Sequence, residues 1–224
     1  MNHAEFNVRT VISSMFAENA YILHLRDRQE CLVFDPGFDA DQIIGEIREY
    51  NLSVAAIVNT HGHADHIAGN AALKQQWPSA PIVIGQGDST NLLNPEENLS
   101  AQFGFPITSP PADRLLVEGD VFSAAGFSFD IYQTPGHSAG HIIFVWKAAT
   151  PWIVMGGDVL FQGSVGRTDF PGCDADTLLN SIHSKLFTLP NDTIVLPGHG
   201  ESTTIGEEKR TNPFVGEPAG HTFN

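Results

Sequence analysis

The sequence predicts a mixed α/β domain, and three observations indicate this class. Short apolar segments alternate with amphipathic helical segments, and this succession of strands followed by a helix occurs twice. Candidate metal ligands follow apolar segments in both halves, which is where α/β proteins place their sites. The chain has 224 residues, of which 42% are hydrophobic, enough for one substantial core. We expect residues 1–224 to form one domain; two sheets face to face with helices outside fit this pattern, although the pattern alone establishes only a mixed α/β domain.

The first half contains five predicted strands and two predicted helices. A helix is expected over residues 41–50, where isoleucines fall on one face and Asp39 is a suitable N-cap. A second helix is expected over residues 67–77. Residues 87–113 are rich in Asn, Pro and Ser without a clear period, which indicates irregular structure. Apolar or alternating runs predict strands at residues 8–16, 20–25, 31–34, 54–59 and 81–85.

The second half repeats this pattern. Residues 175–186 predict a helix with an apolar stripe of leucine and isoleucine, and Asp174 is a good N-cap. Strands are predicted at residues 121–124, 127–133, 141–147, 152–155 and 193–196.

The composition restricts the possible partners and compartments. The formal net charge is -15, with 26 acidic residues against 11 basic ones, so the chain lacks the basic surface that nucleic acids and anionic membranes require. No apolar stretch is long enough to cross a bilayer, and the N-terminus has no basic start followed by an apolar block. Two cysteines, Cys31 in a strand and Cys173 in a loop, do not make a disulfide framework. We expect a cytoplasmic protein; nothing in the sequence predicts its oligomeric state.

The run THGHADH is the strongest functional signal. It places four side chains able to bind a metal within six residues: His61, His63, Asp65 and His66. The first two histidines are two residues apart in an extended segment, so both can point to one face. The aspartate and the last histidine enter the next predicted helix and can approach from another side, serving a second metal. Nitrogen and oxygen ligands of this kind suit zinc, or iron or manganese.

Three more candidates follow predicted strands and stand beside glycine, where backbone can pass close to a site. They are His137 after Thr-Pro-Gly, Asp158 after Gly-Gly, and His199 after Leu-Pro-Gly. His141 lies close to the first of these, and we interpret it as a buried hydrogen-bonding residue rather than a ligand.

In type, spacing and order these seven residues resemble the metal ligands of the metallo-β-lactamase superfamily, and the resemblance covers nearly the whole chain. It implies a four-layer αββα sandwich of two mixed β-sheets with helices outside. It also implies two divalent ions, expected to be zinc, with a hydroxide between them. By this resemblance one metal takes His61, His63 and His137, the other takes Asp65, His66 and His199, and Asp158 bridges them.

Such a site suits hydrolysis, because a metal lowers the pKa of bound water to about 7 and a second ion can hold the developing oxyanion. Asp65 and Asp158 are the expected catalytic side chains, since they can orient the hydroxide and take its proton. No Ser-His-Asp arrangement stands out in the sequence.

A closer resemblance concerns the substrate. The segment GSVGRTDFP at residues 163–171, the LPGHG at residues 196–200 and the NPF at residues 212–214 resemble the small glyoxalase II-like hydrolases. That family implies cleavage of hydroxyacyl thioesters of glutathione, such as S-lactoylglutathione. Full glyoxalase II enzymes carry a C-terminal helical domain that holds glutathione. We expect no such domain here, which leaves the physiological thiol open.

Arg167 is the best candidate for binding a substrate carboxylate, because a guanidinium group binds carboxylate in a fixed fork. The alternative, weighed equally, is that Arg167 pairs with Asp169 and supports its own loop.

A second function remains open. The segments around residues 63–67 and 166–170 also resemble persulfide dioxygenases, which share this fold. Those enzymes hold one iron with two histidines and a carboxylate, here His61, His137 and Asp158. A cysteine usually found just before that Gly-Arg is absent from this chain. A lactonase or β-lactamase is the weaker alternative.

Overall fold

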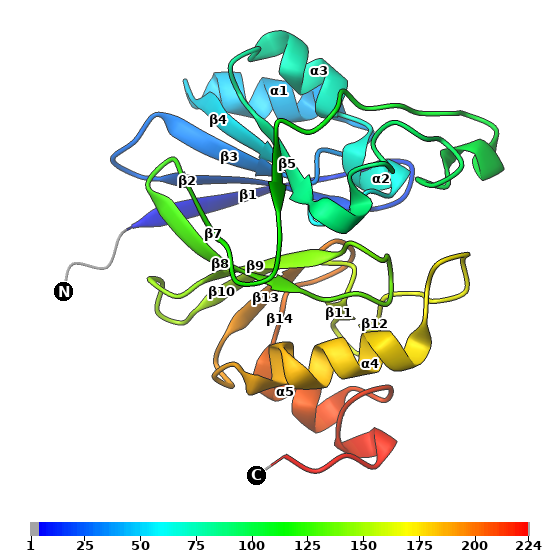
Figure 1. Cartoon of the computed structure of the whole chain (residues 1–224). Helices are drawn as coiled ribbons and strands as arrows, with labels where there is room; N and C mark the ends of the chain where they lie inside the picture. Colours follow the sequence, from blue (N-terminus) through cyan, green and yellow to red (C-terminus); the bar gives the residue numbers. More distant parts are fainter. Residues whose placement is uncertain (1–4, 224) are drawn as a thin grey trace.

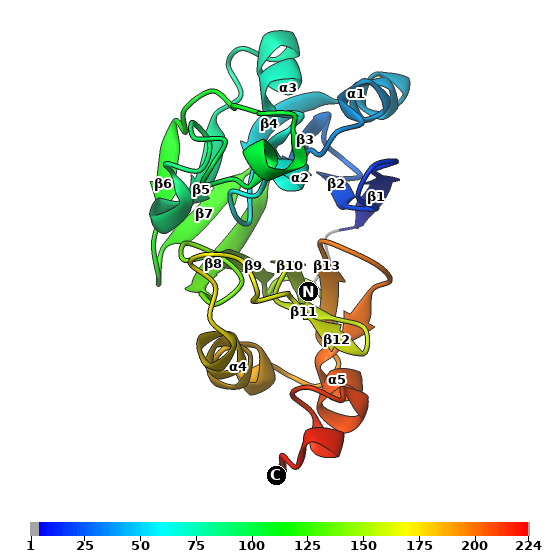
Figure 2. The ribbon, with the colours of Figure 1, turned by 90° about the vertical axis from the view of Figure 1, so that its right-hand side faces the viewer.

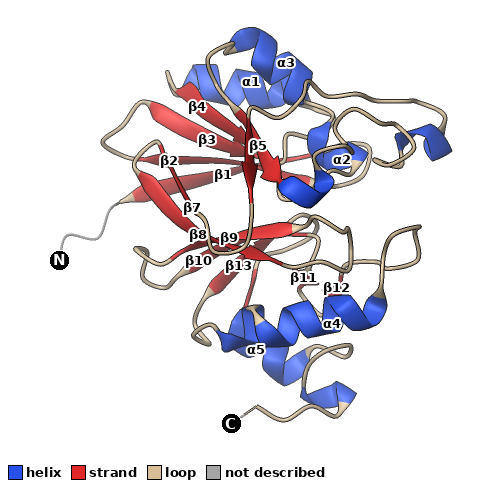
Figure 3. Cartoon of the chain, in the orientation of Figure 1, coloured by secondary structure: helices blue, strands red, loops and turns tan. Residues whose placement is uncertain are grey.

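Two six-stranded β-sheets stack face to face in the computed structural model, which describes residues 5–223 (Figure 1). Helices cover the outer face of each sheet, and loops connect the layers (Figure 3). The predicted four-layer αββα sandwich of two mixed sheets is therefore confirmed.

The first sheet has the order β1-β2-β3-β4-β5-β6. The first three strands pair antiparallel, and β3 to β6 pair parallel. Helices α1 (Ala40–Glu49) and α3 (Asn70–Gln76) cover its outer face, where the isoleucine stripe of α1 packs against buried side chains of the sheet. The strands are β1 (Phe6–Ile12), β2 (Asn19–Leu25), β3 (Glu30–Phe34), β4 (Ser53–Val58), β5 (Ile82–Gly85) and β6 (Arg114–Leu116).

The second sheet has the order β14-β13-β10-β9-β8-β7, and only β10 and β13 pair parallel. Helices α4 (Ala175–Ser184) and α5 (Ile205–Thr211) lie on the side away from the first sheet (Figure 2). The strands are β7 (Val121–Ala124), β8 (Phe127–Gln133), β9 (Ile142–Trp146), β10 (Ile153–Gly157), β13 (Ile194–Pro197) and β14 (Thr203–Thr204). A small hairpin of β11 (Leu160–Phe161) and β12 (Ser164–Val165) forms a separate two-stranded sheet.

An aromatic core joins the sheets. The ring of Phe34 from the first sheet packs edge-on against Phe129 and Phe144 of the second, with centroid separations of 5.7 and 5.2 Å. All three side chains are fully buried. Such burial is a main source of stability, and this shared core supports our proposal that the chain is one domain.

Two predicted elements are shorter or broken. The first strand ends at Ile12 rather than residue 16, because the chain turns between Ser13 and Ala17. The Ala17 N–H donates to the Ser13 carbonyl at 2.9 Å, and Ala17 adopts a left-handed φ of 54°. The predicted helix over residues 67–77 is two helices, α2 (Ala64–Ile67) and α3. Gly69 separates them where its N–H donates to the Pro36 carbonyl at 2.8 Å.

Helices α1 and α4 begin differently. Asp174 caps α4 as predicted, and its carboxylate accepts from the Thr177 N–H at 2.7 Å. Asp39 precedes α1 without a side-chain cap bond; its carboxylate accepts instead from the N–H of Ser14 at 2.7 Å. None of the helices within residues 5–223 is long and apolar enough to span a membrane.

Candidate metal centre

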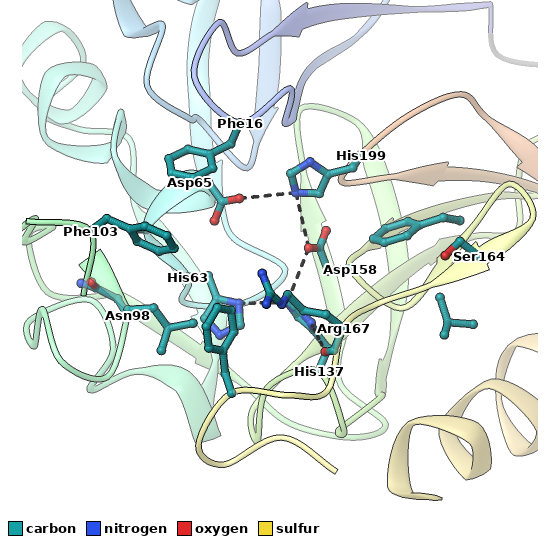
Figure 4. A pocket seen from close by; sticks show the side chains of 15 residues that line it. Phe16, His63, Asp65, Asn98, Phe103, His137, Asp158, Ser164, Arg167 and His199 are labelled. Atoms are coloured by element: carbon teal, nitrogen blue, oxygen red, sulfur yellow. Dashed lines mark hydrogen bonds and ion pairs between the residues drawn. The ribbon is translucent and has the colours of Figure 1, made fainter. Parts of the chain in front are cut away.

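All seven predicted ligands meet at one edge of the sandwich. Four lie in the loop after β4 and in α2, and three lie in the loops that follow β8, β10 and β13. The apolar strands are buried between the layers, so the polar side chains at their carboxyl ends emerge together. Figure 4 shows five of them around a pocket: His63, Asp65, His137, Asp158 and His199.

The first group contains three buried histidines. His61, His63 and His137 each offer a ring nitrogen, and these atoms lie within 4.8 Å of one another. Nδ1 of His63 lies 2.9 Å from Nε2 of His137. This is the set that the superfamily resemblance assigned to one metal.

The second group contains Asp65, His66 and His199, whose ligand atoms also lie within 4.8 Å of one another. Oδ2 of Asp65 lies 3.4 Å from Nε2 of His199 and 3.8 Å from Nε2 of His66. His66 is fully buried, whereas 28% of the His199 side chain is exposed. This group therefore lies at the more open side of the cluster.

Asp158 contacts both groups. Its Oδ2 lies 3.5 Å from Nε2 of His137 and 3.4 Å from Nε2 of His199. Its Oδ1 lies 3.5 Å from Nε2 of His66. One carboxylate therefore stands between the two sets of ligands.

Asp35 orients two of the histidine rings. Its carboxylate accepts from the N–H and the hydroxyl of Thr60, both at 2.7 Å. Because the Thr60 hydroxyl donates to Asp35, its oxygen can accept from Nδ1 of His61 at 3.1 Å, which leaves Nε2 of His61 with a free lone pair. Asp35 Oδ2 also lies 3.2 Å from Nδ1 of His66.

The second half has its own supporting contacts. Nδ1 of His137 donates to the backbone carbonyl of Arg167 at 2.9 Å, so Nε2 faces the cluster. His141 is buried behind Asp158: its Nε2 accepts from the Asp158 N–H at 3.1 Å, and its Nδ1 donates to the Thr134 hydroxyl at 3.0 Å. His141 is the hydrogen-bonding residue that the sequence suggested.

Electrostatics differ between the two groups. Burial and neighbouring histidines hold the pKa of His61 well below its usual value and lower the pKa of His63 to about 3. Neutral imidazoles keep the lone pair that binds metal. Burial opposes protonation of His199, but hydrogen bonds to Asp158 and Asp65 raise its pKa to about 10. The buried carboxylates therefore require positive charge beside them, which a proton or a metal cation can supply.

The residues fit bound cations. Within the described chain, three converging atoms are buried without a hydrogen-bond partner: Nε2 of His61, Nε2 of His66 and Oδ1 of Asp158. An unpaired buried polar atom costs about 1–3 kcal/mol, and a cation would remove that cost. Gly198 provides the necessary space, because a Cβ there would collide with Oδ1 of Asp158. Imidazole nitrogens with carboxylate oxygens suit zinc, iron or manganese.

Sequence reasoning missed two supporting carboxylates, Asp35 and Asp88. Asp88 is buried and accepts from the Gly62 N–H at 3.0 Å, the Ser138 hydroxyl at 2.6 Å and the Gly140 N–H at 2.6 Å. Asp88 therefore connects the loop that carries His61 and His63 with the loop that carries His137. Both aspartates follow predicted strands closely, and this signal, which identified the other candidates, also applies to them.

A pocket with a volume of about 300 Å³ opens onto the cluster, and Arg167 lines it. The Arg167 guanidinium donates to both carboxylate oxygens of Asp169 at 2.7 Å and lies 4.0 Å from the centroid of the Phe170 ring. The structure thus shows the pairing of Arg167 with Asp169 that was one of the two expected roles. The same guanidinium also borders the pocket.

Comparison with known proteins establishes the family. The family model for the metallo-β-lactamase superfamily matches residues 15–199 of this chain. The chain is 38% identical to hydroxyacylglutathione hydrolase GloC of Haemophilus influenzae over 212 residues, covering 93% of this chain and 98% of that protein. It is 41% identical to probable metallo-hydrolase YqgX of Bacillus subtilis over 199 residues, covering 88% and 92%. The chain belongs to the metallo-β-lactamase superfamily.

Solved structures show the same relationship. The BLEG-1 B3 metallo-β-lactamase is 38% identical with a TM-score of 0.88, covering 93% of this chain and 99% of that one. TTHA1623, solved in a di-iron-bound form, is 35% identical with a TM-score of 0.80, covering 92% and 100%. These relatives differ in named activity at similar identity, so the substrate has to be argued from the site.

Proposed function

We propose that this chain is a metal-dependent hydrolase that holds two divalent ions, zinc foremost, and cleaves hydroxyacyl thioesters such as S-lactoylglutathione. The observation that carries the proposal is the position of Asp158, within 3.5 Å of histidine nitrogens from both ligand groups. The identity to hydroxyacylglutathione hydrolase GloC supports thioesters as the substrate class. In this proposal the first ion is held by His61, His63 and His137, the second by Asp65, His66 and His199, and Asp158 is shared.

Bound divalent ions would lower the pKa of a water molecule to about 7 and polarise the thioester carbonyl. The chain's own part is to hold the ligands in place and to receive the proton of the attacking water. Asp65 and Asp158 are the carboxylate residues that line the pocket. Although burial would raise the pKa of Asp158, His66 and His199 hold it well below its usual value, so this carboxylate is ionised at neutral pH.

The leaving group also fits. A thiol has a pKa of about 8.5, so a thiolate departs without a dedicated general acid. Arg167 is the proposed substrate-binding residue: exchanging its Asp169 partner for a substrate carboxylate would keep its two parallel hydrogen bonds.

The test is a parallel assay of metal-loaded protein with S-lactoylglutathione, following free thiol, and with nitrocefin. The metal content of the same sample is measured by mass spectrometry. We expect about two ions per chain, thiol release, and little nitrocefin turnover; His199→Ala should abolish thiol release. Purified protein that holds no transition metal and gains none on incubation would overturn the proposal.

A second candidate is β-lactam hydrolysis, favoured by the 38% identity to the BLEG-1 B3 metallo-β-lactamase. Strong nitrocefin turnover without thiol release would establish it. The single-iron dioxygenase is a third outcome of the same experiment: one iron per chain, retained in His199→Ala, with O₂ consumed in the presence of glutathione persulfide.

A further inference from the structure

We propose that the pocket wall formed by Phe16, Leu99 and Phe103 is an acyl-binding subsite. It selects thioesters with bulky apolar acyl groups, aromatic ones above all, over the small lactoyl group. This inference rests on the proposed thioester hydrolysis and names its substrate class.

Four phenylalanines from three separate segments pack together beside the metal cluster; we call Phe16, Phe38, Phe103 and Phe105 the phenylalanine cluster. The Phe16 ring lies 5.5 Å from Phe38, 5.6 Å from Phe103 and 6.4 Å from Phe105, measured between centroids. These are separations of interacting aromatic rings. Of these four, Phe16 and Phe103 line the pocket, and Phe38 and Phe105 pack against them outside it.

The cluster presents an open apolar face. Phe103 remains 47% exposed despite its aromatic neighbours. When an apolar group of a ligand covers an exposed aromatic surface inside a pocket, the burial of both surfaces makes the binding free energy more favourable. A phenyl group has the shape and quadrupole to continue the edge-to-face packing that the cluster already shows.

Leu99 is held in a strained backbone conformation at this wall. Its φ of 70° is left-handed, which costs a residue with a Cβ about 1–2 kcal/mol. The buried side chain of Asn98 fixes the turn: it donates to the carbonyls of Asn91 at 3.0 Å and Ile107 at 2.9 Å, and accepts from the Ser100 N–H at 3.0 Å. Strain that the surroundings enforce is concentrated at functional sites. Here it turns the Leu99 side chain into the pocket wall.

The wall is also tied to the metal cluster. The Asn98 carbonyl accepts from the N–H of Ala64 at 3.0 Å, and Ala64 begins the helix that carries Asp65. In Figure 4, Phe16 lies next to Asp65, and Phe103 and Asn98 lie on the same side of the pocket. An acyl group resting on this wall therefore has a fixed position relative to the metal ligands.

The opposite side of the pocket differs in carrying a cation. Arg167 and Ser164 lie there, across the cluster from Phe103 (Figure 4). The apolar side chains of Phe161, Val165 and Phe170 line the pocket beside them. The guanidinium fits a leaving thiol that carries a carboxylate, and the wall of Phe16, Leu99 and Phe103, which has no charged group, fits the acyl group. The two halves of the substrate thus meet at the metal cluster, where the thioester carbon must lie.

The experiment compares S-mandeloylglutathione with S-lactoylglutathione, which differ only in a phenyl in place of a methyl group. We expect kcat/KM about tenfold higher for the mandeloyl thioester, the range that apolar pocket contacts give. Phe103→Ala should remove most of this preference, reducing the mandeloyl rate about tenfold and the lactoyl rate much less. Leu93→Ala is the matched control: it is an apolar residue of the same segment, 53% exposed, and lines neither side of the pocket. It should change neither rate.

A binding measurement separates this inference from the proposed function. Titration calorimetry of metal-loaded protein with mandelate and lactate requires no turnover, and both acids offer the same carboxylate and hydroxyl. Tighter mandelate binding that Phe103→Ala abolishes supports the subsite, even if neither thioester is hydrolysed and the proposed function fails. Equal binding of the two acids, with lactoyl thioester cleaved at least as fast as mandeloyl, overturns the subsite and leaves the hydrolase intact. Failure of both ligands to bind overturns it as well.

Discussion

The two halves of this molecule build their shares of the ligand cluster in different ways. The N-terminal half supplies His61, His63, Asp65 and His66 from six consecutive residues in the loop after β4 and in α2. The C-terminal half supplies one ligand from each of three loops, which the order of its strands brings together. The first set is fixed by local chain geometry, whereas the second exists only when the second sheet is correctly paired. Substitutions in the two halves should therefore have different consequences.

The largest effect should come from the residue that joins the halves. Asp158→Ala removes the carboxylate that lies within 3.5 Å of histidines from both groups, so both ions should bind weakly and metal content should fall below one ion per chain. Thioester hydrolysis should fall more than about 100-fold, the upper effect of losing a residue that merely supports a ligand. Metal analysis and thiol release measure this. Asp169→Ala, which changes an exposed carboxylate of the same half, should retain its metal; a matching loss there would contradict the assignment.

Single-ligand variants should separate the two groups. His63→Ala and His199→Ala should each keep about one ion, because each belongs to one group only. Each ion stabilises the fold by about 2.7 kcal/mol at a hundredfold excess over Kd, or roughly 5–10 °C in melting temperature for a chain of this size. Either variant should therefore melt about midway between the metal-loaded and the chelated wild type. Coincidence with the chelated protein would show that the two ions bind only together.

A smaller effect on metal binding should follow from replacing Asp35, the N-terminal carboxylate that orients ligand histidines. Asp35→Asn weakens the orientation of His66 directly and of His61 through Thr60, one ring in each group. Metal affinity should fall about 10–100-fold for both ions while the fold is kept. A competition titration with a chelator gives the affinities. Loss of only one ion would mean that Asp35 supports only one of the two rings.

The smallest effect concerns the outer helices. Asp174→Ala removes a side-chain cap from α4 and should lower the melting temperature by roughly 2–4 °C near pH 7. Hydrogen bonding to Thr177 lowers the pKa of Asp174, so its contribution is present above the unfolded pKa and is lost as the pH falls through the folded value. The difference from wild type should therefore disappear in acid. Asp39→Ala, at the uncapped α1, should loosen the Ser14 turn instead.

The difference between the halves also explains what the sequence revealed. The long strands were visible because their apolar runs are buried on both sides or alternate with period two. The seven candidate ligands were found because each follows such a run. The pairing of each ligand with one ion came only from the family resemblance, because it depends on which strands are neighbours.

Several elements that were not predicted are too short to show a sequence signal. Strands β11, β12 and β14 are two residues long, too short to show a period. The break before α3 depends on a contact of Gly69 with the Pro36 carbonyl, from a distant part of the chain. The sequence left two roles open for Arg167, and only the structure shows its hydrogen bond to Asp169.

Gly198 carries no functional group, yet it has as little freedom to change as a ligand. A methyl group at this position would occupy the space of Oδ1 of Asp158 and come within 2.7 Å of Cε1 of His66. A survey of tolerated substitutions would therefore rank this residue among the most restricted in the chain, although it performs no chemistry. Intolerance to mutation at Gly198 would reflect the space that its neighbours occupy. A list of catalytic residues drawn from mutational tolerance alone would therefore include a position that has no side chain to take part in the chemistry.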